Sequence, residues 1–364
     1  FVLIDPELGG GTGSNTGLGT RGLYGGGTTP SVATNRIGFL TLSTLGNGQD
    51  FGDLTVARFQ LGGHGSRNRG IFNMGEVNGS PNFTNTIDFV TIASLGNASD
   101  FGDLTISVTG LAGMSSSAGR GVFAGGWTGG NTNVIQYITI DNTGNATDFG
   151  DLTTATEFGA ACTDGERGVF GGGTQSSVTN VIEYITVAST GNATDFGDMT
   201  DGRSAPAGLG DTTRGCMGGG STGSIVNIID YITIATTGNA VYFGDIYARG
   251  WGGGACANGT RVIYAGGHQG ASPYPTTTDM YEYSFTSQGW QGDFGNLTTL
   301  SRSVGNMTSP TRAVWPMGTD EESPTAINVI DYSSMHTKGN ANDFGDLSVA
   351  RYDFQSGSNA HGGL

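Results

Sequence analysis

The sequence contains few of the residues that usually form disulfides or carry catalytic chemistry. Its 364 residues include one lysine, Lys338, four histidines and three cysteines. A small, odd number of cysteines does not form a disulfide framework. Cys162 and Cys256 hold the same position in two non-adjacent copies of a repeated segment, so their separation should exceed the roughly 7 Å between Cα atoms that a disulfide allows. We therefore predict that Cys162, Cys216 and Cys256 are free thiols.

Groupings typical of metal sites and catalytic centres are also missing. The four histidines, His64, His268, His336 and His361, do not have metal-ligand spacing. No nucleophile elbow, Cys/His pair or asymmetric pair of carboxylates stands out. The sequence therefore predicts a protein that is not an enzyme and that uses neither a metal ion nor a cofactor.

Positive charge is scarce. Fifteen basic residues face 31 acidic ones, which gives a formal net charge of -16. Such a surface repels phosphate backbones and anionic membranes. No apolar run approaches the length of about 18 residues that a membrane span requires. We predict neither nucleic-acid binding nor membrane insertion.

Glycine is abundant, with 68 residues, and one phrase recurs along the chain. Residues 144–153 read Gly-Asn-Ala-Thr-Asp-Phe-Gly-Asp-Leu-Thr. Six relatives of this phrase follow a period of about 50 residues, which indicates a repeat architecture. They centre on Phe51, Phe101, Phe196, Phe243, Phe294 and Phe344.

Each repeat has the pattern of four strands. In one copy, residues 156–162 form a small-residue strand A, 167–173 a strand B ending in glycine, 180–187 a β-branched and aromatic strand C, and 195–199 a short strand D. Four strands in such a repeat are typical of a propeller blade. We predict an all-β, seven-bladed β-propeller with four antiparallel strands per blade. Strand A should line the central channel, and the bulky residues of strands B and C should lie between blades. The Asp-Phe-Gly-Asp phrase should form the C–D turn that leads into strand D, with its phenylalanine in the space between blades.

The two ends of the repeat array complement each other. Residues 351–359 can supply only a strand A, whereas residues 21–53 supply strands B, C and D. The C-terminal strand should therefore complete the N-terminal blade and close the ring without an open sheet edge. This assigns residues 20–364 to the propeller. Residues 1–19 remain as an N-terminal arm or linker, or as an irregular cap.

Two polar positions recur with the repeat. We predict that each recurrent arginine bonds aspartate carboxylates or turn carbonyls, and that both positions lie on the face carrying the A–B and C–D turns. A ring of anion sites is the alternative. The arginines are Arg21, Arg69, Arg120, Arg167, Arg214, Arg261 and Arg312, and the aspartates are Asp53, Asp103, Asp151, Asp198, Asp245 and Asp346.

The B–C loops vary most between repeats, and variable loops on a rigid scaffold commonly bind ligands. An aromatic side chain beside an arginine could stack on a sugar or hold an acidic group. Ordinary loop decoration is the alternative. The candidate binding residues on this face are Arg58, Trp127, Arg203, Arg249, His268, Tyr274, Arg302 and Arg351.

The pattern over residues 20–360 resembles the kelch repeat. Strand B ends in Gly-Gly, strand C carries an aromatic residue such as Tyr137, Tyr184 or Tyr231, and another aromatic residue opens strand D. Phe149 and its equivalents stand where kelch repeats usually carry tryptophan. This resemblance implies the propeller fold and leaves function open.

A narrower resemblance concerns strings such as residues 227–234 followed by Gly-Asn-Ala and Asp-Phe-Gly-Asp. They are similar to kelch-like repeats in structural proteins of tailed phages, often in tail fibres or other appendages. The resemblance implies an extracellular protein on the virion surface, with roles in host attachment and receptor binding. Its partners would be other virion proteins and host surface glycan, and assembly could make it oligomeric.

Two other classes of function remain open. One is a secreted carbohydrate-active propeller, either an enzyme or a lectin. An enzyme of this kind would need carboxylates that converge on one pocket. The other is a kelch-type adaptor for protein interactions, a class that usually carries accessory domains.

Overall fold

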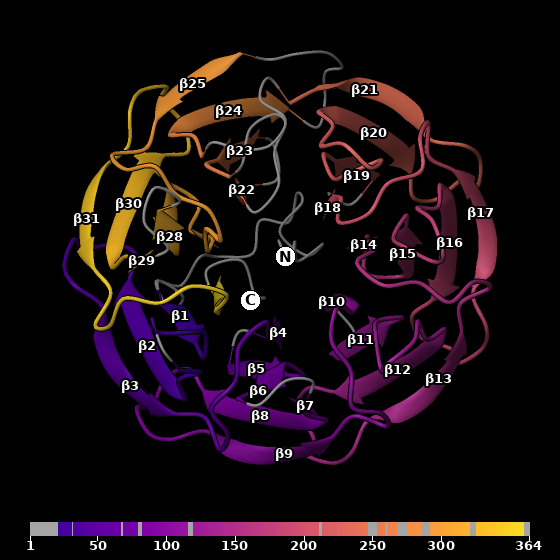
Figure 1. Cartoon of the computed structure of the whole chain (residues 1–364), viewed down its shortest axis with the longest axis horizontal. Helices are drawn as coiled ribbons and strands as arrows, with labels where there is room; N and C mark the ends of the chain where they lie inside the picture. Colours follow the sequence, from indigo (N-terminus) through magenta and orange to yellow (C-terminus); the bar gives the residue numbers. More distant parts are fainter. Residues whose placement is uncertain are drawn as a thin grey trace.

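In the computed structural model, seven four-stranded antiparallel sheets surround a central channel (Figure 1). The structure describes residues 21–359, except 31, 67, 79–81, 116–118, 211–212, 247–252, 259–260, 268–275, 285–291 and 321–324. Residues 1–19, predicted to form an arm, lie outside the described residues. Within the described ranges, no helix is long and apolar enough to span a membrane.

Each blade runs from an innermost strand A to an outermost strand D, and its strands are named in that order. Blade 1 contains β32 (Gln355–Ser358), β1 (Arg21–Gly25), β2 (Arg36–Thr41) and β3 (Gln49–Asp53). Blade 2 contains β4 (Gly62–Gly65), β5 (Arg69–Asn73), β8 (Thr86–Thr91) and β9 (Ser99–Asp103). Blade 3 contains β10 (Ala112–Ser115), β11 (Arg120–Ala124), β12 (Val134–Thr139) and β13 (Thr147–Asp151). Blade 4 contains β14 (Ala160–Thr163), β15 (Arg167–Gly171), β16 (Val181–Thr186) and β17 (Thr194–Asp198).

The remaining three blades follow the same order. Blade 5 contains β18 (Ala207–Gly210), β19 (Arg214–Gly218), β20 (Ile228–Thr233) and β21 (Val241–Asp245). Blade 6 contains β22 (Gly254–Ala257), β23 (Arg261–Ala265), β24 (Asp279–Ser284) and β25 (Asp293–Asn296). Blade 7 contains β26 (Met307–Thr308), β27 (Arg312–Pro316), β30 (Val329–Ser334) and β31 (Asn342–Asp346). Short ribbons β6–β7 (Glu76–Val77, Asn82–Phe83) and β28–β29 (Thr319–Asp320, Thr325–Ala326) extend two B–C loops.

The predicted ring closure is confirmed. The C-terminal strand β32 pairs with β1, so that Gly22 faces Ser358 and Gly25 faces Gln355. The predicted division of side chains is also confirmed. Strand β14 consists of small residues, whereas bulky residues of strands B, C and D fill clusters that span neighbouring blades. The three cysteines are buried free thiols, as predicted.

The Asp-Phe-Gly-Asp motif forms strand D itself and not the C–D turn. In blade 4, Ile182 faces Gly197 and Glu183 faces Asp195, so Phe196 is the extra residue of a β-bulge. Phe196 is buried in a cluster that includes residues of blade 5. The predicted packing of this phenylalanine between blades is confirmed.

The register separates the two recurrent polar positions. Arg167 faces Thr186 at one end of β16, whereas Asp198 faces Val181 at the other end. The prediction that both lie on one face, where they could pair, is therefore wrong. Strand D runs the length of strand C and carries its last aspartate away from the A–B turn.

The recurrent arginines instead join blades through main-chain carbonyls. Arg167 Nη1 donates to the Ile234 carbonyl of the next blade at 3.0 Å, and its guanidinium lies 4.8 Å from the centre of the Tyr184 ring. Equivalent carbonyl bonds are made by Arg21, Arg69, Arg120, Arg261 and Arg312. Equivalent ring contacts are made by Arg21, Arg69, Arg120, Arg214 and Arg312. Of the two partners predicted for these arginines, aspartate carboxylates and turn carbonyls, the structure shows the carbonyls.

The Gly-Asn-Ala turn clamps the outer strand of the preceding blade. Gly191 N donates to the Phe149 carbonyl at 2.7 Å, and Ala193 N donates to the Asp151 carbonyl at 2.8 Å. Asp151 N in turn donates to Asn192 Oδ1 at 3.1 Å. The same three bonds recur at five further interfaces, where the clamping asparagines are Asn47, Asn97, Asn145, Asn239 and Asn340. We call this arrangement the rim clamp. It pairs backbone groups of an edge strand that would otherwise be open.

Candidate functional site: the mouth of the central channel

A ring of residues in an unusual conformation surrounds one mouth of the channel. Each lies in the connection from strand D of one blade to strand A of the next, at the offset that separates Asp151 from Phe158. Their φ angles lie between 50° and 67°, a left-handed conformation that is uncommon for residues other than glycine. We call this set the mouth ring: Gln60, Gly110, Phe158, Ala205, Ser303 and Asp353.

Main-chain hydrogen bonds connect neighbouring members of the mouth ring. Phe158 N donates to the Gly110 carbonyl at 2.9 Å, and Ala205 N donates to the Phe158 carbonyl at 2.8 Å. Gln60 N makes the same bond to the Asp353 carbonyl at 2.9 Å. The surrounding structure therefore fixes a strained backbone conformation, a situation that is common at binding sites. The side chains on this repeated backbone differ from one position to the next.

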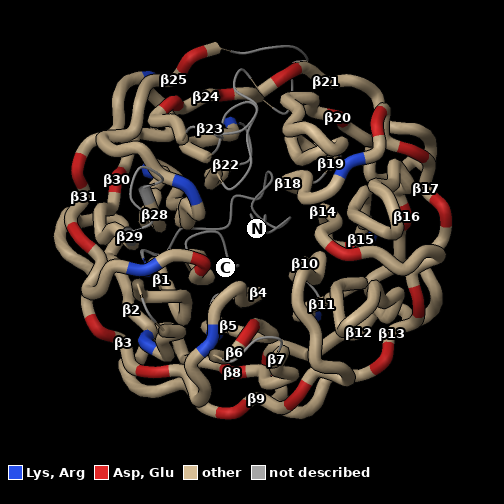
Figure 2. The backbone as a smooth tube through the Cα atoms, viewed as in Figure 1, with Lys and Arg blue, Asp and Glu red and all other residues tan. Residues whose placement is uncertain are grey.

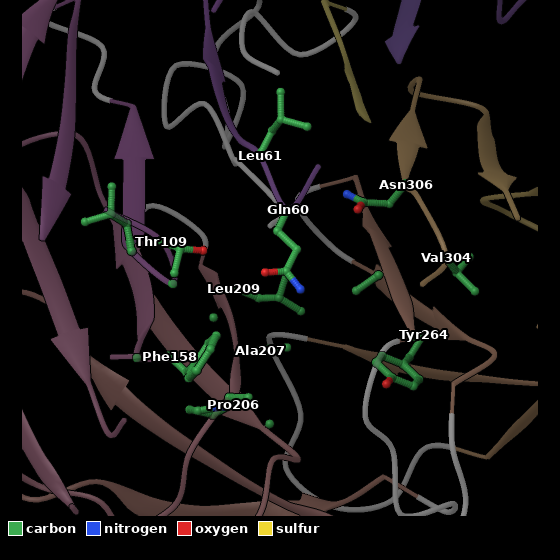
Figure 3. A pocket seen from close by; sticks show the side chains of 18 of the residues that line it. Gln60, Leu61, Thr109, Phe158, Pro206, Ala207, Leu209, Tyr264, Val304 and Asn306 are labelled. Carbon is green, nitrogen blue, oxygen red and sulfur yellow. The ribbon is translucent and has the colours of Figure 1, made fainter. Parts of the chain in front are cut away.

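Four members of the mouth ring, Gln60, Gly110, Phe158 and Ala205, line a cavity of about 390 Å³ (Figure 3). One part of its wall is apolar and includes Leu111, Pro206 and Leu209. The amides of Gln60 and Asn306 add polar groups. A mostly apolar cavity of a few hundred Å³ with a few polar groups is typical of small-ligand sites.

Phe158 is the prominent aromatic residue of this cavity. It is 47% exposed although most large apolar side chains of the described residues are buried. Its ring lies over Gly110, where a Cβ atom would come within 3.1 Å of Phe158 Cε1. The missing side chain at Gly110 thus leaves room for the ring, which is held with part of its surface open to solvent.

The cavity wall carries almost no ionisable group. Among the described residues that line it, Tyr264 alone has a titratable side chain, and burial raises its pKa to about 12. Deeper in the channel wall, burial lowers the pKa of His64 to about 3, so this imidazole is neutral at pH 7. No group of three or more His, Cys, Asp or Glu side chains in the described part of the chain could hold a metal ion. The lining suits recognition of an uncharged ligand.

Three of the arginines predicted to bind a ligand are instead completely buried. Arg58 Nη2 lies 3.1 Å from Asp88 Oδ2, and Arg203 Nη2 lies 2.9 Å from Asp230 Oδ2. Arg351 Nη1 donates to the Gly26 and Arg36 carbonyls. The prediction that these three arginines form part of a binding face is wrong. Each of these arginines lies in the connection from strand D to the next blade, and its guanidinium group bonds acceptors that are buried in the interface with that blade.

Two of the other predicted residues lie on the mouth side of the ring. Trp127 is half-buried, and its main chain pairs with that of Thr109, which lines the cavity. Arg302 is half-buried and directly precedes Ser303 of the mouth ring. Arg249, His268 and Tyr274 lie outside the described residues.

Sequence reasoning missed Phe158, Gln60 and Asn306. Residues 156–162 were predicted to form strand A, but β14 begins only at Ala160, and the residues before it form the channel mouth. One signal was available in the repeat. Aligned copies place Gln60, Gly110, Phe158 and Ala205 at one position, and this chemical variety is unusual for a buried inner strand.

No protein-family model matches the chain, and no curated protein matches it either.

Proposed function

We propose that this protein is a non-enzymatic binding propeller that recognises a neutral glycan at the channel mouth. The observation that carries the proposal is Phe158, half-exposed at φ +54° beside a cavity with almost no ionisable lining. Sugars present apolar C–H faces that pack on aromatic rings. Their hydroxyl groups also require hydrogen-bonding partners, which the exposed Gln60 amide can provide.

The lack of acid–base groups favours binding over hydrolysis. Glycoside hydrolysis uses two carboxyl groups on either side of the scissile bond. The described lining of the cavity contains no carboxyl group. A bound sugar would therefore be held and released unchanged.

We further propose that the propeller is displayed on a phage virion, as part of a tail fibre or other surface appendage. The kelch-like repeat pattern and its similarity to repeats of phage appendage proteins support this placement. In that setting the channel mouth would contact a host surface glycan, and other faces would contact neighbouring virion proteins. Immunogold labelling of particles with an antibody against the propeller tests this placement, and particles without label would contradict it.

A glycan array with the purified protein tests the binding site. We expect specific binding of a neutral glycan by the wild-type protein and roughly a fivefold to thirtyfold loss of affinity in Phe158→Ala, because one stacking contact is worth about 1–2 kcal/mol. Mass spectrometry of the recovered glycan should show no cleavage. Released sugar would contradict the non-enzymatic assignment.

Leu95→Ala is a matched control because Leu95 is also an exposed apolar residue, with 58% of its surface accessible, but it lies in a C–D turn. This variant should bind as the wild type does. Equal losses in the two variants, or full binding by Phe158→Ala, would rule out the channel mouth as the glycan site.

A further inference from the structure

At five interfaces between blades, the same position of the sequence repeat supplies a buried hydrogen-bond acceptor. The third residue of strand C accepts hydrogen bonds from a threonine that follows strand D of the preceding blade. Thr55 N and Oγ1 donate to Asp88 at 3.1 and 2.6 Å, and Thr200 N and Oγ1 donate to Asp230 at 3.1 and 2.6 Å. We call these residues the interface acceptors: Asp88, Gln136, Glu183, Asp230 and Asp331.

At two interfaces a guanidinium neutralises the acceptor. Arg58 pairs with Asp88 and also donates to the Phe72 carbonyl at 3.1 Å. Arg203 pairs with Asp230 and also donates to the Met217 carbonyl at 2.9 Å. At the interface between blades 2 and 3 the acceptor is the neutral Gln136, and Val108 stands at the arginine position.

Two interfaces combine an acidic acceptor with a small residue at the arginine position. Between blades 6 and 7 these are Asp331 and Ser301, and between blades 3 and 4 they are Glu183 and Thr156. Thr156 stands at the arginine position, and a cavity of about 20 Å³ lies there. The cavity is lined by Glu183, by three threonines including Thr156, and by Phe170, which is the equivalent of Phe72 and Met217. Glu183 is only 5% exposed, and burial raises the pKa of its carboxyl group.

We propose that this cavity binds one monovalent alkali-metal cation, which takes the place of the guanidinium found at two of the related interfaces. A cavity of this size holds one water-sized occupant. The oxygen-bearing side chains of its lining are the Glu183 carboxylate and three threonine hydroxyls, and oxygen atoms are the ligands that hard cations prefer. A single positive charge balances the single carboxylate of Glu183, whereas a divalent ion would leave a net buried charge.

Thermal unfolding in sodium chloride, compared with choline chloride at equal ionic strength, tests the proposal. A ligand that binds only the native state raises the melting temperature as its concentration rises. We expect sodium to raise the melting temperature of the wild type by about 2 °C or more above the choline series. Coincident sodium and choline curves would show that the cavity holds only water, and would overturn the proposal.

Two variants that copy neighbouring interfaces make the test specific. Glu183→Gln reproduces the neutral acceptor of blade 3, and Thr156→Arg reproduces the paired guanidinium of Arg58. Both should lose the sodium-specific rise. Glu166→Gln, at an exposed acid of the same blade, should keep it. A sodium effect that survives in both interface variants would place the cation elsewhere and contradict the proposal.

Discussion

The outer rim and the channel mouth use the repeat in opposite ways. At the rim, the same clamp recurs with nearly the same residues at six described interfaces. At the mouth, the same left-handed backbone carries glutamine, glycine, phenylalanine, alanine, serine and aspartate. Acidic residues mark the outer strands all round the ring (Figure 2). Constant residues on a constant backbone indicate a requirement of the fold, whereas varied side chains on a constant backbone leave room for recognition.

The largest loss of stability is expected in the buried layer between the rim and the mouth. Replacing Arg203 by valine leaves Asp230 buried without its guanidinium, and removal of one partner of a buried ion pair costs about 3–5 kcal/mol. We expect a loss of this size in the free energy of unfolding, measured by denaturant titration.

The double variant Arg203→Val, Asp230→Gln reproduces the neutral interface of Val108 and Gln136. It should recover most of the lost stability. A double variant as unstable as the single one would show that the arginine contributes through packing rather than through charge.

A substitution that disrupts the rim clamp should reduce the free energy of unfolding by nearly as much. A Cβ atom at Gly150, where φ is +146°, would approach the Gly191 carbonyl oxygen to 2.4 Å. Gly150→Ala should therefore lose about 3 kcal/mol. Gly144 has a similar φ of +156° but no neighbour within 4 Å of such a Cβ, so Gly144→Ala should lose only about 1 kcal/mol. Equal losses would mean that backbone strain, and not contact between blades, dominates at the rim.

The recurrent arginines should make a smaller contribution. Arg167→Ala removes a ring contact with Tyr184 and a hydrogen bond to the Ile234 carbonyl. We expect a loss of about 2 kcal/mol and a lower melting temperature in calorimetry. Arg36→Ala, at an exposed arginine, should change stability by less than about 0.5 kcal/mol. An unchanged melting temperature in Arg167→Ala would refute the structural role.

Substitutions at the channel mouth should change the free energy of unfolding least and glycan binding most. Phe158→Gly replaces a half-exposed side chain and relieves its left-handed conformation. The free energy of unfolding should change by less than about 1 kcal/mol, while glycan affinity falls by at least as much as in Phe158→Ala. A large loss of stability would assign Phe158 to the structural core and would remove the contrast between rim and mouth.

The repeat made most of the fold predictable. The period gave seven blades, and the leftover strand A at one end gave the closing pair β32–β1. The burial of Phe196 and its equivalents followed from their repetition in short strands. These features depend on local pattern and counting, which a single sequence displays directly.

The site was harder to predict because its features depend on register and backbone conformation. An arginine such as Arg203 has the same appearance in sequence whether it faces solvent or a buried Asp230. Phenylalanine rarely adopts a left-handed conformation, so the residue type alone does not indicate that Phe158 does so. The face of Asp198 depended on whether Asp-Phe-Gly-Asp formed a turn or a strand, and the bulge at Phe196 decided this.

The shared blade has a consequence for synthesis of the chain on the ribosome. Strands β1 to β3 emerge before the other strands of the propeller, but their inner partner β32 emerges some 300 residues later. At about 5–20 residues per second, the first sheet must wait for roughly 15–60 seconds with its inner edge unpaired. The nascent ring is therefore exposed to mispairing at this edge until Gln355–Ser358 arrive, and a stalled ribosome would prolong that exposure.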